Sequence, residues 1–400
     1  MPLKILYRLA KLRTCALLIA APLGAQGTTR APVAVPAAWA TFTRQFDATA
    51  DSTHVVGGSA VLVRDGRIIA RHNYGFGDRA RGERVTDRTL FHYASITKTL
   101  TAIAIMQLRD RGRLSLDDPV TRWVPELRQL HDPYGAIDSV TIRMLLSHTS
   151  GFQNLTWPYG TGAAWEPFEP TTWAQLVAMM PYQQLLFRPG SRFSYSNPAY
   201  IYLARVIEAL TGDPWSVYVQ KNILSPLGLS RSYFGATPYY LAADRSNNYT
   251  VTKDSAGTVV VHENGRDFDP GITIPNGGWN APLDDMATYV AFLTGSAHGD
   301  TALARRYDAV LSRATLQEMW RPVIATGDGD RASMGLGFYL YSIRNATYVG
   351  HDGCQAGFTS YLLINPANAT AVAAAINTTG TPSCEGPLPG QRAVLRLLRE

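Results

Sequence analysis

The sequence predicts a mixed α/β (α+β) fold, in which strands lie near both ends of the chain and helices occupy most of the middle. Near the N-terminus, SAVLVRDGRIIARHN forms two β-type runs around Asp65-Gly66, which is a strong hairpin signal. Near the C-terminus, three further β-type runs precede a final helix with an apolar stripe, AVLRLLRE. Between these ends, residues from about 95 to 330 are mostly helical and loop segments.

The first 27 residues have the layout of a secretory signal peptide. Lys4, Arg8, Lys11 and Arg13 come first, followed by the apolar stretch CALLIAAPLG and by small residues that end in GAQG. The apolar stretch has about ten residues, which is too short to span a bilayer. We therefore expect residues 1–27 to direct export to the periplasm or the outside of the cell, with no stable membrane span.

The rest of the chain is long enough to bury more than one core. Residues 28–38 form an Ala/Pro-rich linker and residues 39–400 form the main domain. Removing the leader takes away four positive charges and no negative ones, so the net charge falls from +6 to about +2. No lysine- or arginine-rich block remains, so nucleic acid is not a predicted partner. The oligomeric state is left open.

Ser95, Ile96, Thr97 and Lys98 spell S-x-x-K at the predicted first turn of an apolar helix. Residues three apart on a helix share one face, so the Lys98 amine can reach the Ser95 hydroxyl. The positive end of the helix dipole also makes a neutral, proton-accepting lysine less costly. The pattern indicates an activated serine nucleophile, and the alternative is a surface serine beside a solvated lysine.

Tyr195, Ser196 and Asn197 form Y-x-N just ahead of a second apolar helix. A tyrosine can shuttle protons if a neighbouring cation lowers its pKa, and an asparagine can offer both a donor and an acceptor to a substrate amide. The alternative is a loop tyrosine that packs its ring on the core.

His351, Asp352 and Gly353 stand at the end of a short β-type run near the C-terminus. Glycine there would let a substrate backbone lie against the strand edge. The alternative for His351 is a partly buried histidine whose hydrogen bonds are satisfied by the backbone.

These three patterns occur in this order, about 100 and 150 residues apart, and together they resemble the serine penicillin-recognising enzymes. That superfamily includes class C β-lactamases, D-alanyl-D-alanine carboxypeptidases, D-aminopeptidases and β-lactamase-like esterases. The resemblance runs from Trp39 to the end of the chain and includes GRLSLDDPVTRWVPEL, TIRMLLSHTSGF, NILSPLGLSRSYF and MGLGFYLY. It implies an antiparallel five-stranded sheet flanked by helices (residues 39–94 and 331–400), a helical subdomain (residues 95–330) and a site in the cleft between them.

The resemblance also implies the catalytic roles. Ser95 would be acylated, Lys98 would activate it, and Tyr195 would relay a proton to the leaving group. The backbone N–H groups of Ser95 and Cys354 would form the oxyanion hole, and removing such a donor typically costs about a hundredfold or more in rate.

Substrate binding is assigned by the resemblance to Asn197, His351, Asp352 and Gly353. The last three stand where most β-lactamases have Lys-Thr/Ser-Gly, which receives a substrate carboxylate with a cation and a hydroxyl. His351 is only partly charged near neutrality, and the Asp352 carboxylate would repel an anion if it faced the cleft. If Asp352 points away from the cleft, only the backbone of this strand matters for substrate binding.

We therefore expect a secreted serine hydrolase that acts through an acyl-enzyme on Ser95 and cleaves short-chain esters or D-amino-acid amides, with neutral or cationic acyl compounds preferred. The alternatives are a β-lactamase or D-Ala-D-Ala carboxypeptidase and, from another class, a non-catalytic penicillin-binding sensor or scaffold. The expected partner is a small-molecule or peptide-like acyl substrate. H-E-x-x-H and C-x-x-C are absent from the sequence, and neither a metal nor another cofactor is expected.

Two cysteines follow the leader, Cys354 and Cys384, and an oxidising compartment would allow them to pair. In the strand order that the resemblance implies, SYLLINP and TAVAAAINTT are arranged so that Cys384 could fold back toward Cys354. The alternative is two independent small hydrophobic side chains.

Overall fold

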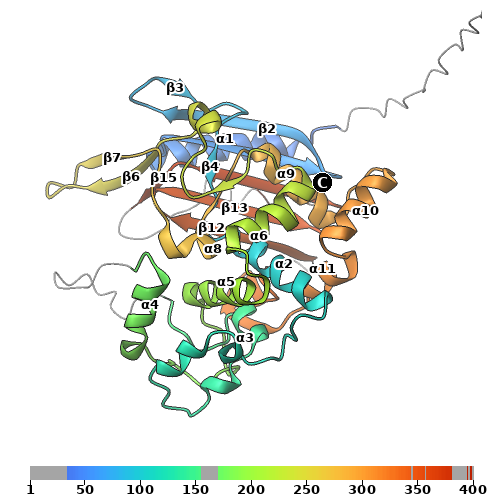
Figure 1. Cartoon of the computed structure of the whole chain (residues 1–400). Helices are drawn as coiled ribbons and strands as arrows, with labels where there is room; N and C mark the ends of the chain where they lie inside the picture. Colours follow the sequence, from blue (N-terminus) through green and yellow to red (C-terminus); the bar gives the residue numbers. More distant parts are fainter. Residues whose placement is uncertain are drawn as a thin grey trace, which may run out of the picture. The chain divides into compact units, whose positions relative to one another are not determined.

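A computed structural model describes residues 34–154, 170–343, 346–355 and 357–380, together with residues 394, 397 and 398. Its centre is a nine-stranded sheet in the order β3-β2-β1-β14-β13-β12-β11-β10-β9, and neighbouring strands are antiparallel (Figure 1). These strands are β1 (Gly57–Arg64), β2 (Arg67–Asp78), β3 (Glu83–Arg84), β9 (Ile324–Asp328), β10 (Arg331–Met334), β11 (Tyr339–Ile343), β12 (Ala346–Gln355), β13 (Phe358–Asn365) and β14 (Thr370–Ile376).

The two ends of the chain join where β1 pairs with β14, with Gly58 opposite Ile376 and Arg64 opposite Thr370. The predicted antiparallel sheet flanked by helices is confirmed, but in the described part of the chain it has nine strands rather than five. The five predicted strands are the central ones, β2, β1, β14, β13 and β12. The added strands β3, β9, β10 and β11 have two to five residues each, which is too short for an alternating pattern to reveal them.

The predicted hairpin is also present, as β1 and β2. Its turn residues Asp65 and Gly66 have φ angles of 49° and 71°. A two-residue turn of this kind needs positive φ at both positions, which glycine adopts freely and aspartate tolerates. Asp-Gly therefore fixes the turn and, with it, the register of the two strands.

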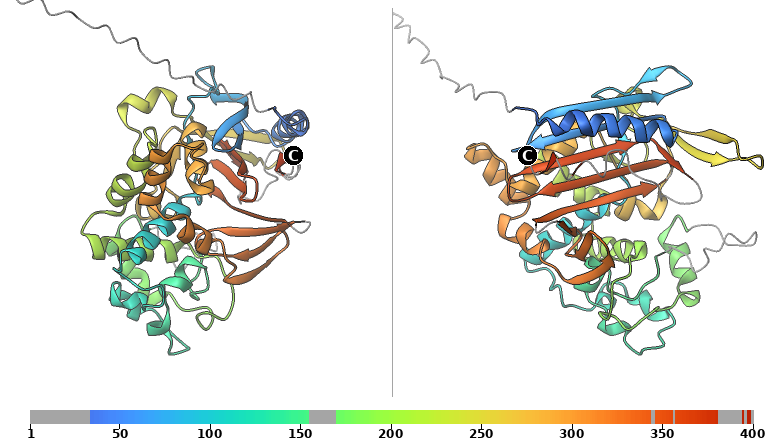
Figure 2. Two further views of the ribbon diagram at one scale, coloured as in Figure 1. Left: turned by 90° about the vertical axis from the view of Figure 1, so that its right-hand side faces the viewer. Right: turned by 180° about the vertical axis from the view of Figure 1, so that it is seen from behind.

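The nine-stranded sheet has a hydrophobic core on each face, because side chains alternate along its strands. In β1, Val61 and Val63 belong to the larger core, whereas Ala60 and Leu62 belong to the smaller one. The smaller core is covered by α1 (Ala38–Ser52), which lies across the sheet in the right-hand view of Figure 2. The larger core is built from side chains of most of the other helices.

These helices are α2 (Thr97–Asp110), α3 (Ile142–Leu146), α4 (Trp173–Met179), α5 (Asn197–Thr211), α6 (Trp215–Val219), α7 (Ser225–Leu227), α8 (Ile274–Gly277), α9 (Leu283–Thr294), α10 (Thr301–Val310) and α11 (Arg313–Met319). Two small sheets accompany them: β4 (Phe91–His92) with β8 (Trp279–Ala281) and β5 (Tyr233–Phe234), and β6 (Asn248–Lys253) with β7 (Val259–Gly265) and β15 (Thr378–Gly380). The segment predicted as helical, residues 95–330, therefore also contains strands β5 to β9.

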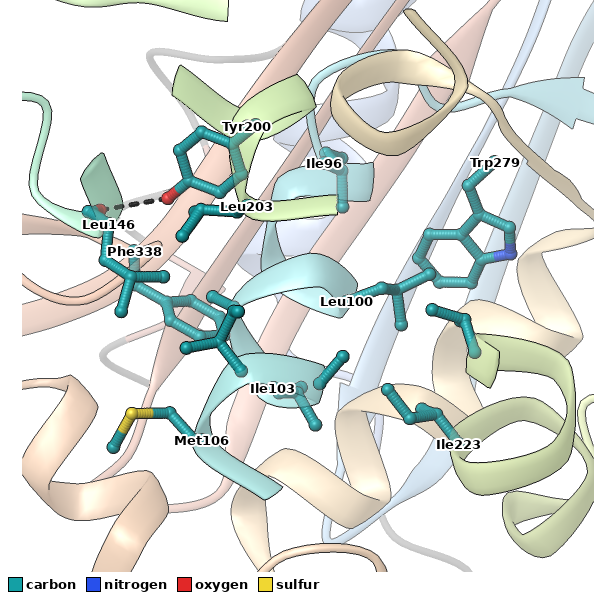
Figure 3. Close-up of a cluster of buried hydrophobic side chains, with 14 of the residues drawn as sticks. Ile96, Leu100, Ile103, Met106, Leu146, Tyr200, Leu203, Ile223, Trp279 and Phe338 are labelled. Atoms are coloured by element: carbon teal, nitrogen blue, oxygen red, sulfur yellow. Dashed lines mark hydrogen bonds between the residues drawn. The ribbon is translucent and has the colours of Figure 1, made fainter. Parts of the chain in front are cut away.

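Helix α2 runs through the middle of the larger core. Every side chain from Thr97 to Leu108 is buried. Figure 3 shows Leu100 and Ile103 packed among apolar side chains from neighbouring elements, and there the Tyr200 hydroxyl donates a hydrogen bond to the Leu146 carbonyl at 2.9 Å. A helix enclosed in this way is a rigid mount for the residues at its start.

The predicted signal peptide and most of the predicted linker lie outside the described residues. Of the predicted C-terminal helix, Val394, Leu397 and Leu398 are described, and all three are buried in the smaller core. Within the described ranges, no helix combines the length and apolar character needed to cross a membrane.

Candidate active site

Ser95 lies in the turn between β4 and α2, two residues before α2 begins rather than inside its first turn. Its carbonyl accepts a hydrogen bond from the Lys98 N–H at 3.0 Å, so the helical relation between these two residues is kept. The preceding residue, Ala94, has a φ of 46°, a conformation that residues other than glycine rarely adopt. Such strained backbone is concentrated at functional sites, and here it stands directly before the predicted nucleophile.

Lys98 is fully buried, with three oxygen atoms around its amine. Its Nζ lies 3.0 Å from Ser95 Oγ, 2.8 Å from Asn197 Oδ1 and 2.9 Å from the carbonyl oxygen of Asn276. Burial lowers the pKa of Lys98 well below its ordinary value, and the negative charge of Asp352 opposes this effect only in part. The neutral amine is therefore favoured.

The three neighbours of Lys98 match the hydrogens and lone pair of a neutral amine. The side-chain oxygen of Asn197 and the carbonyl oxygen of Asn276 can only accept, so each takes one of the two amine hydrogens. The lone pair is then left for the Ser95 hydroxyl, 3.0 Å away. Lys98 is thus placed to act as a general base on Ser95.

Tyr195 lies next to this pair. Its hydroxyl is hydrogen-bonded to Ser95, and Lys98 Nζ lies 4.9 Å from the centre of its ring. Burial raises the pKa of Tyr195 well above its ordinary value, and the hydrogen bond with Ser95 offsets only part of this. The condition that a neighbouring cation lowers the pKa of this tyrosine is not met, because the pKa of Tyr195 is raised and burial favours the uncharged form of Lys98. Tyr195 is therefore a neutral phenol that can donate a proton.

Asn197 is the first residue of α5, and the preceding Ser196 caps that helix by accepting the Ala199 N–H. Besides binding Lys98, Asn197 Oδ1 accepts a hydrogen bond from Asn276 Nδ2 at 3.2 Å. Its own Nδ2 donates to Asn154 Oδ1 at 3.1 Å. Asn197 therefore orients Lys98 in this structure, and its contact with a substrate stays a prediction.

Strand β12 passes close to Ser95 at Gly353. A Cβ atom at this position would lie 2.2 Å from the Tyr93 carbonyl oxygen and 2.9 Å from the Ser95 nitrogen, so glycine is required for this approach. β12 pairs with β11 only as far as Gly350, and within the described residues 351–355 pair with β13 alone. The other edge of this segment is left open, and an open edge can pair with an extended substrate backbone.

The charges at His351 and Asp352 differ from those expected. His351 is buried, its Nδ1 lies 2.5 Å from the Asp352 carbonyl oxygen, and burial lowers its pKa to about 4. It is thus neutral near pH 7 rather than partly charged. The Asp352 carboxylate forms an ion pair with Arg331 of β10 at 2.8 Å, which compensates its charge. The repulsion of an anion by Asp352, expected if it faced the cleft, stays a prediction.

Sequence reasoning missed three residues that shape the site: Asn276, Arg331 and His148. Asn276 contributes a backbone carbonyl, which no residue type can signal. Arg331 reaches Asp352 from two strands away, a pairing that only the sheet order creates. His148 packs on Tyr195. It belongs to the segment TIRMLLSHTSGF, and the resemblance of that segment to the family was the signal that could have identified this residue.

Cys354 follows Gly353 and is disulfide-bonded. Its predicted partner, Cys384, lies outside the described residues, so the pairing itself stays a prediction. The assignment of the Ser95 and Cys354 N–H groups to an oxyanion hole also stays a prediction.

The fold and this cluster agree with the comparisons with known proteins. The model of the beta-lactamase family matches residues 42–395. The chain therefore belongs to the beta-lactamase family, and its predicted membership of the serine β-lactamase and penicillin-binding superfamily is confirmed.

The chain is 33% identical over 257 residues to Esterase EstB of Burkholderia gladioli, a match that covers 58% of this chain and 64% of the esterase. It thus spans less than two thirds of that relative's length. Among solved structures, it is similar to the octameric penicillin-binding protein homologue from Pyrococcus abyssi, with 26% identity, a TM-score of 0.73 and coverage of 90% of this chain and 77% of the other. It is also similar to a D-stereospecific amidohydrolase from Streptomyces sp., with 26% identity, a TM-score of 0.68 and coverage of 90% and 98%.

Proposed function

We propose that this chain is a serine hydrolase that forms an acyl-enzyme on Ser95 and cleaves esters or amides. The observation that carries the proposal is the buried Lys98 amine, 3.0 Å from Ser95 Oγ, with Asn197 and Asn276 accepting its hydrogens. The esterase and the amidohydrolase among the similar proteins support the same chemistry.

In the proposed reaction, Ser95 Oγ attacks the carbonyl carbon of the substrate while its proton passes to the lone pair of Lys98. The backbone N–H groups of Ser95 and Cys354 stabilise the resulting oxyanion. When the tetrahedral intermediate collapses, the Tyr195 hydroxyl protonates the leaving group and is reprotonated by Lys98. A water molecule then attacks the Ser95 ester, the acid is released, and Ser95 Oγ regains its proton.

The groups beside Gly353 favour an uncharged substrate. His351 is neutral near pH 7, and the charges of Asp352 and Arg331 cancel. A carboxylate-bearing β-lactam or D-Ala-D-Ala peptide would therefore find no uncompensated cation in this group. A cationic substrate gains little either, because Arg331 already neutralises Asp352. We accordingly place short-chain neutral esters first.

Labelling with a fluorescent fluorophosphonate, followed by peptide mass spectrometry, tests the nucleophile. We expect the label on Ser95, none on the Ser95→Ala variant, and normal labelling of Ser225→Ala, a matched control at the start of α7. Label on another residue would contradict the assignment.

Turnover of a short p-nitrophenyl ester separates a hydrolase from a non-catalytic acyl-binding scaffold. We expect release of many equivalents of p-nitrophenol per chain. A burst of one equivalent with no further release would favour the scaffold.

The charge argument is tested by kcat/KM on a short p-nitrophenyl ester, a chromogenic cephalosporin and a D-amino-acid p-nitroanilide. We expect the ester to give the highest value. Arg331→Gln exposes the Asp352 charge, and it should lower kcat/KM about three- to tenfold more for the anionic cephalosporin than for the ester, whereas Asp352→Asn should shift selectivity the other way. A cephalosporin value far above the other two and insensitive to both variants would favour β-lactamase instead.

We also propose that the chain is exported, on the basis of the signal-peptide pattern in residues 1–27. Mass spectrometry of protein recovered from the periplasm or the medium should show an N-terminus near residue 28. Full-length protein confined to the cytoplasm would contradict this.

A further inference from the structure

His148 holds the backbone on both sides of Tyr195. Its carbonyl oxygen accepts a hydrogen bond from the Ser194 N–H at 2.8 Å, and its ring nitrogen Nδ1 accepts one from the Ser196 N–H at 3.1 Å. His148 has a φ of 56°, which turns its carbonyl and its ring toward the same stretch of chain. One residue thus fixes the segment that carries Tyr195 at two points.

The ring of His148 also packs directly on the ring of Tyr195. The two rings are stacked, with centroids 4.4 Å apart and planes at 29°. His148 is fully buried, so this stack is shielded from water. Tyr195 also neighbours Ser95 and Lys98, so the imidazole packs on a ring that already lies beside both residues, and it limits how far the phenol can move.

The hydrogen bond to Ser196 requires a neutral imidazole, because Nδ1 must keep its lone pair. Burial lowers the pKa of His148 well below its ordinary value. The rings of Tyr195 and Tyr200 also face it. The other ring nitrogen, Nε2, is buried and has no hydrogen-bond partner among the described residues. The ring is therefore held by its stack and by Nδ1.

We propose that His148 is a positioning residue for the reaction, which holds the Tyr195 hydroxyl against Ser95 through two backbone hydrogen bonds and one stacked ring. The inference rests on the acyl-enzyme chemistry proposed for Ser95. It assigns to His148 no contact with the substrate and no proton transfer. Its effect on catalysis must therefore pass through the hydroxyl of Tyr195.

Two variants each remove a different contact of the His148 side chain. His148→Asn can keep an acceptor near the Nδ1 position, tolerates the positive φ and loses the stacked ring. His148→Phe keeps a ring and loses the acceptor. Each is made in the native chain and in the Tyr195→Phe background, and thermal melts establish that each protein is folded. The readouts are the rate of fluorophosphonate labelling of Ser95, and kcat and KM for a short p-nitrophenyl ester.

In the native background, we expect each His148 variant to lower the labelling rate and kcat about tenfold or more, with KM within about twofold. In the Tyr195→Phe background, the same variants should change the rate less than about twofold, because the hydroxyl that His148 positions is already absent. His92→Asn is the matched control, since His92 is also buried and bonds to Asn280 and Gln355 instead. Its effect should be equal in both backgrounds.

If the His148 variants lowered the labelling rate and kcat as strongly in the Tyr195→Phe background as in the native one, the inference would be overturned, because His148 would then act independently of Tyr195. Native-like rates in both His148 variants would overturn it as well. If the native chain itself is not labelled on Ser95, the proposed function fails, and the inference fails with it. Labelling of the native chain combined with equal effects in the two backgrounds leaves the proposed function intact and removes only the role of His148.

Discussion

At the scale of single residues, the state of Lys98 depends on how its amine is solvated. A lysine on the surface is protonated at neutral pH, and it then has no lone pair with which to accept a proton. Lys98 is fully buried, and burial lowers its pKa well below the ordinary value. The same burial has a cost in stability, because the unfolded chain carries this lysine protonated and hydrated.

Replacing Lys98 with methionine should therefore separate stability from activity. Between the lowered pKa of the folded state and about 10.5, the unfolded chain binds one more proton, so the free energy of unfolding contributed by Lys98 rises with pH. We expect Lys98→Met to have a higher melting temperature than the native protein at pH 7. This difference should shrink as the pH approaches about 10.5. Ester hydrolysis should fall about 10²- to 10⁴-fold.

Thermal melts from pH 7 to 10 and ester turnover check this prediction. Lys253→Met is the control, because Lys253 is exposed and should change neither activity nor the pH dependence of stability. A Lys98→Met protein with native turnover, or with a melting difference that does not vary with pH, would contradict it.

At the scale of elements, the site depends on the contact between strand β12 and the start of helix α2. Gly353 makes that contact possible, because its missing Cβ leaves room for the Tyr93 carbonyl and the Ser95 nitrogen. Both elements are held firmly, since α2 is enclosed by the larger core and β12 is paired with β13 from Val349 to Gln355. Neither can retreat without disturbing the packing around it.

Gly353→Ala should therefore damage both stability and activity. The new methyl group would lie 2.2 Å from the Tyr93 carbonyl, so β12 or the turn before α2 must shift. We expect a loss of about 1–3 kcal/mol in the free energy of unfolding and a fall in ester turnover of at least about tenfold. Denaturant titration and kinetics measure the two effects. In the control Gly380→Ala, a Cβ atom would meet nothing within 4 Å, so both quantities should stay near native values. A Gly353→Ala protein that matches this control would contradict the prediction.

At the scale of the whole molecule, the sheet ties the two ends of the chain together beside the site. The β1–β14 pairing links residues more than 300 positions apart, and β12 carries Gly353 and Cys354 to Ser95. Cys354 is disulfide-bonded, which adds a covalent tie next to that contact. If Cys384 is its partner, the chain beyond β15 is anchored to the strand that borders Ser95.

Cys384→Ser should then destabilise the protein. Closing a loop of about 30 residues stabilises by about 3.6 kcal/mol in the chain-entropy model. We expect a lower melting temperature and lower ester turnover, and a similar change when the native protein is reduced. Cys15→Ser is the control and should have no effect. Two free thiols from Cys354 and Cys384 in denatured, unreduced protein would rule out the bridge.

The sequence by itself determined the features that depend on short-range geometry. Asp65-Gly66 predicted the hairpin, because few other dipeptides tolerate positive φ at both turn positions. The three-residue spacing of Ser95 and Lys98 predicted their contact, because it places them on one face of a helical turn. The order of the three motifs predicted the family.

Tertiary structure decided the features that depend on contacts between distant segments. The neutral state of Lys98 follows from its burial, and Asn276, 178 residues away, accepts one of its hydrogens. The charge of Asp352 is cancelled by Arg331, which only the sheet order brings near. Spacing along a chain encodes local periodicity, whereas a pKa depends on desolvation and on every charge that packing places nearby. For that reason the sequence could indicate the candidate side chains but could not assign their charges.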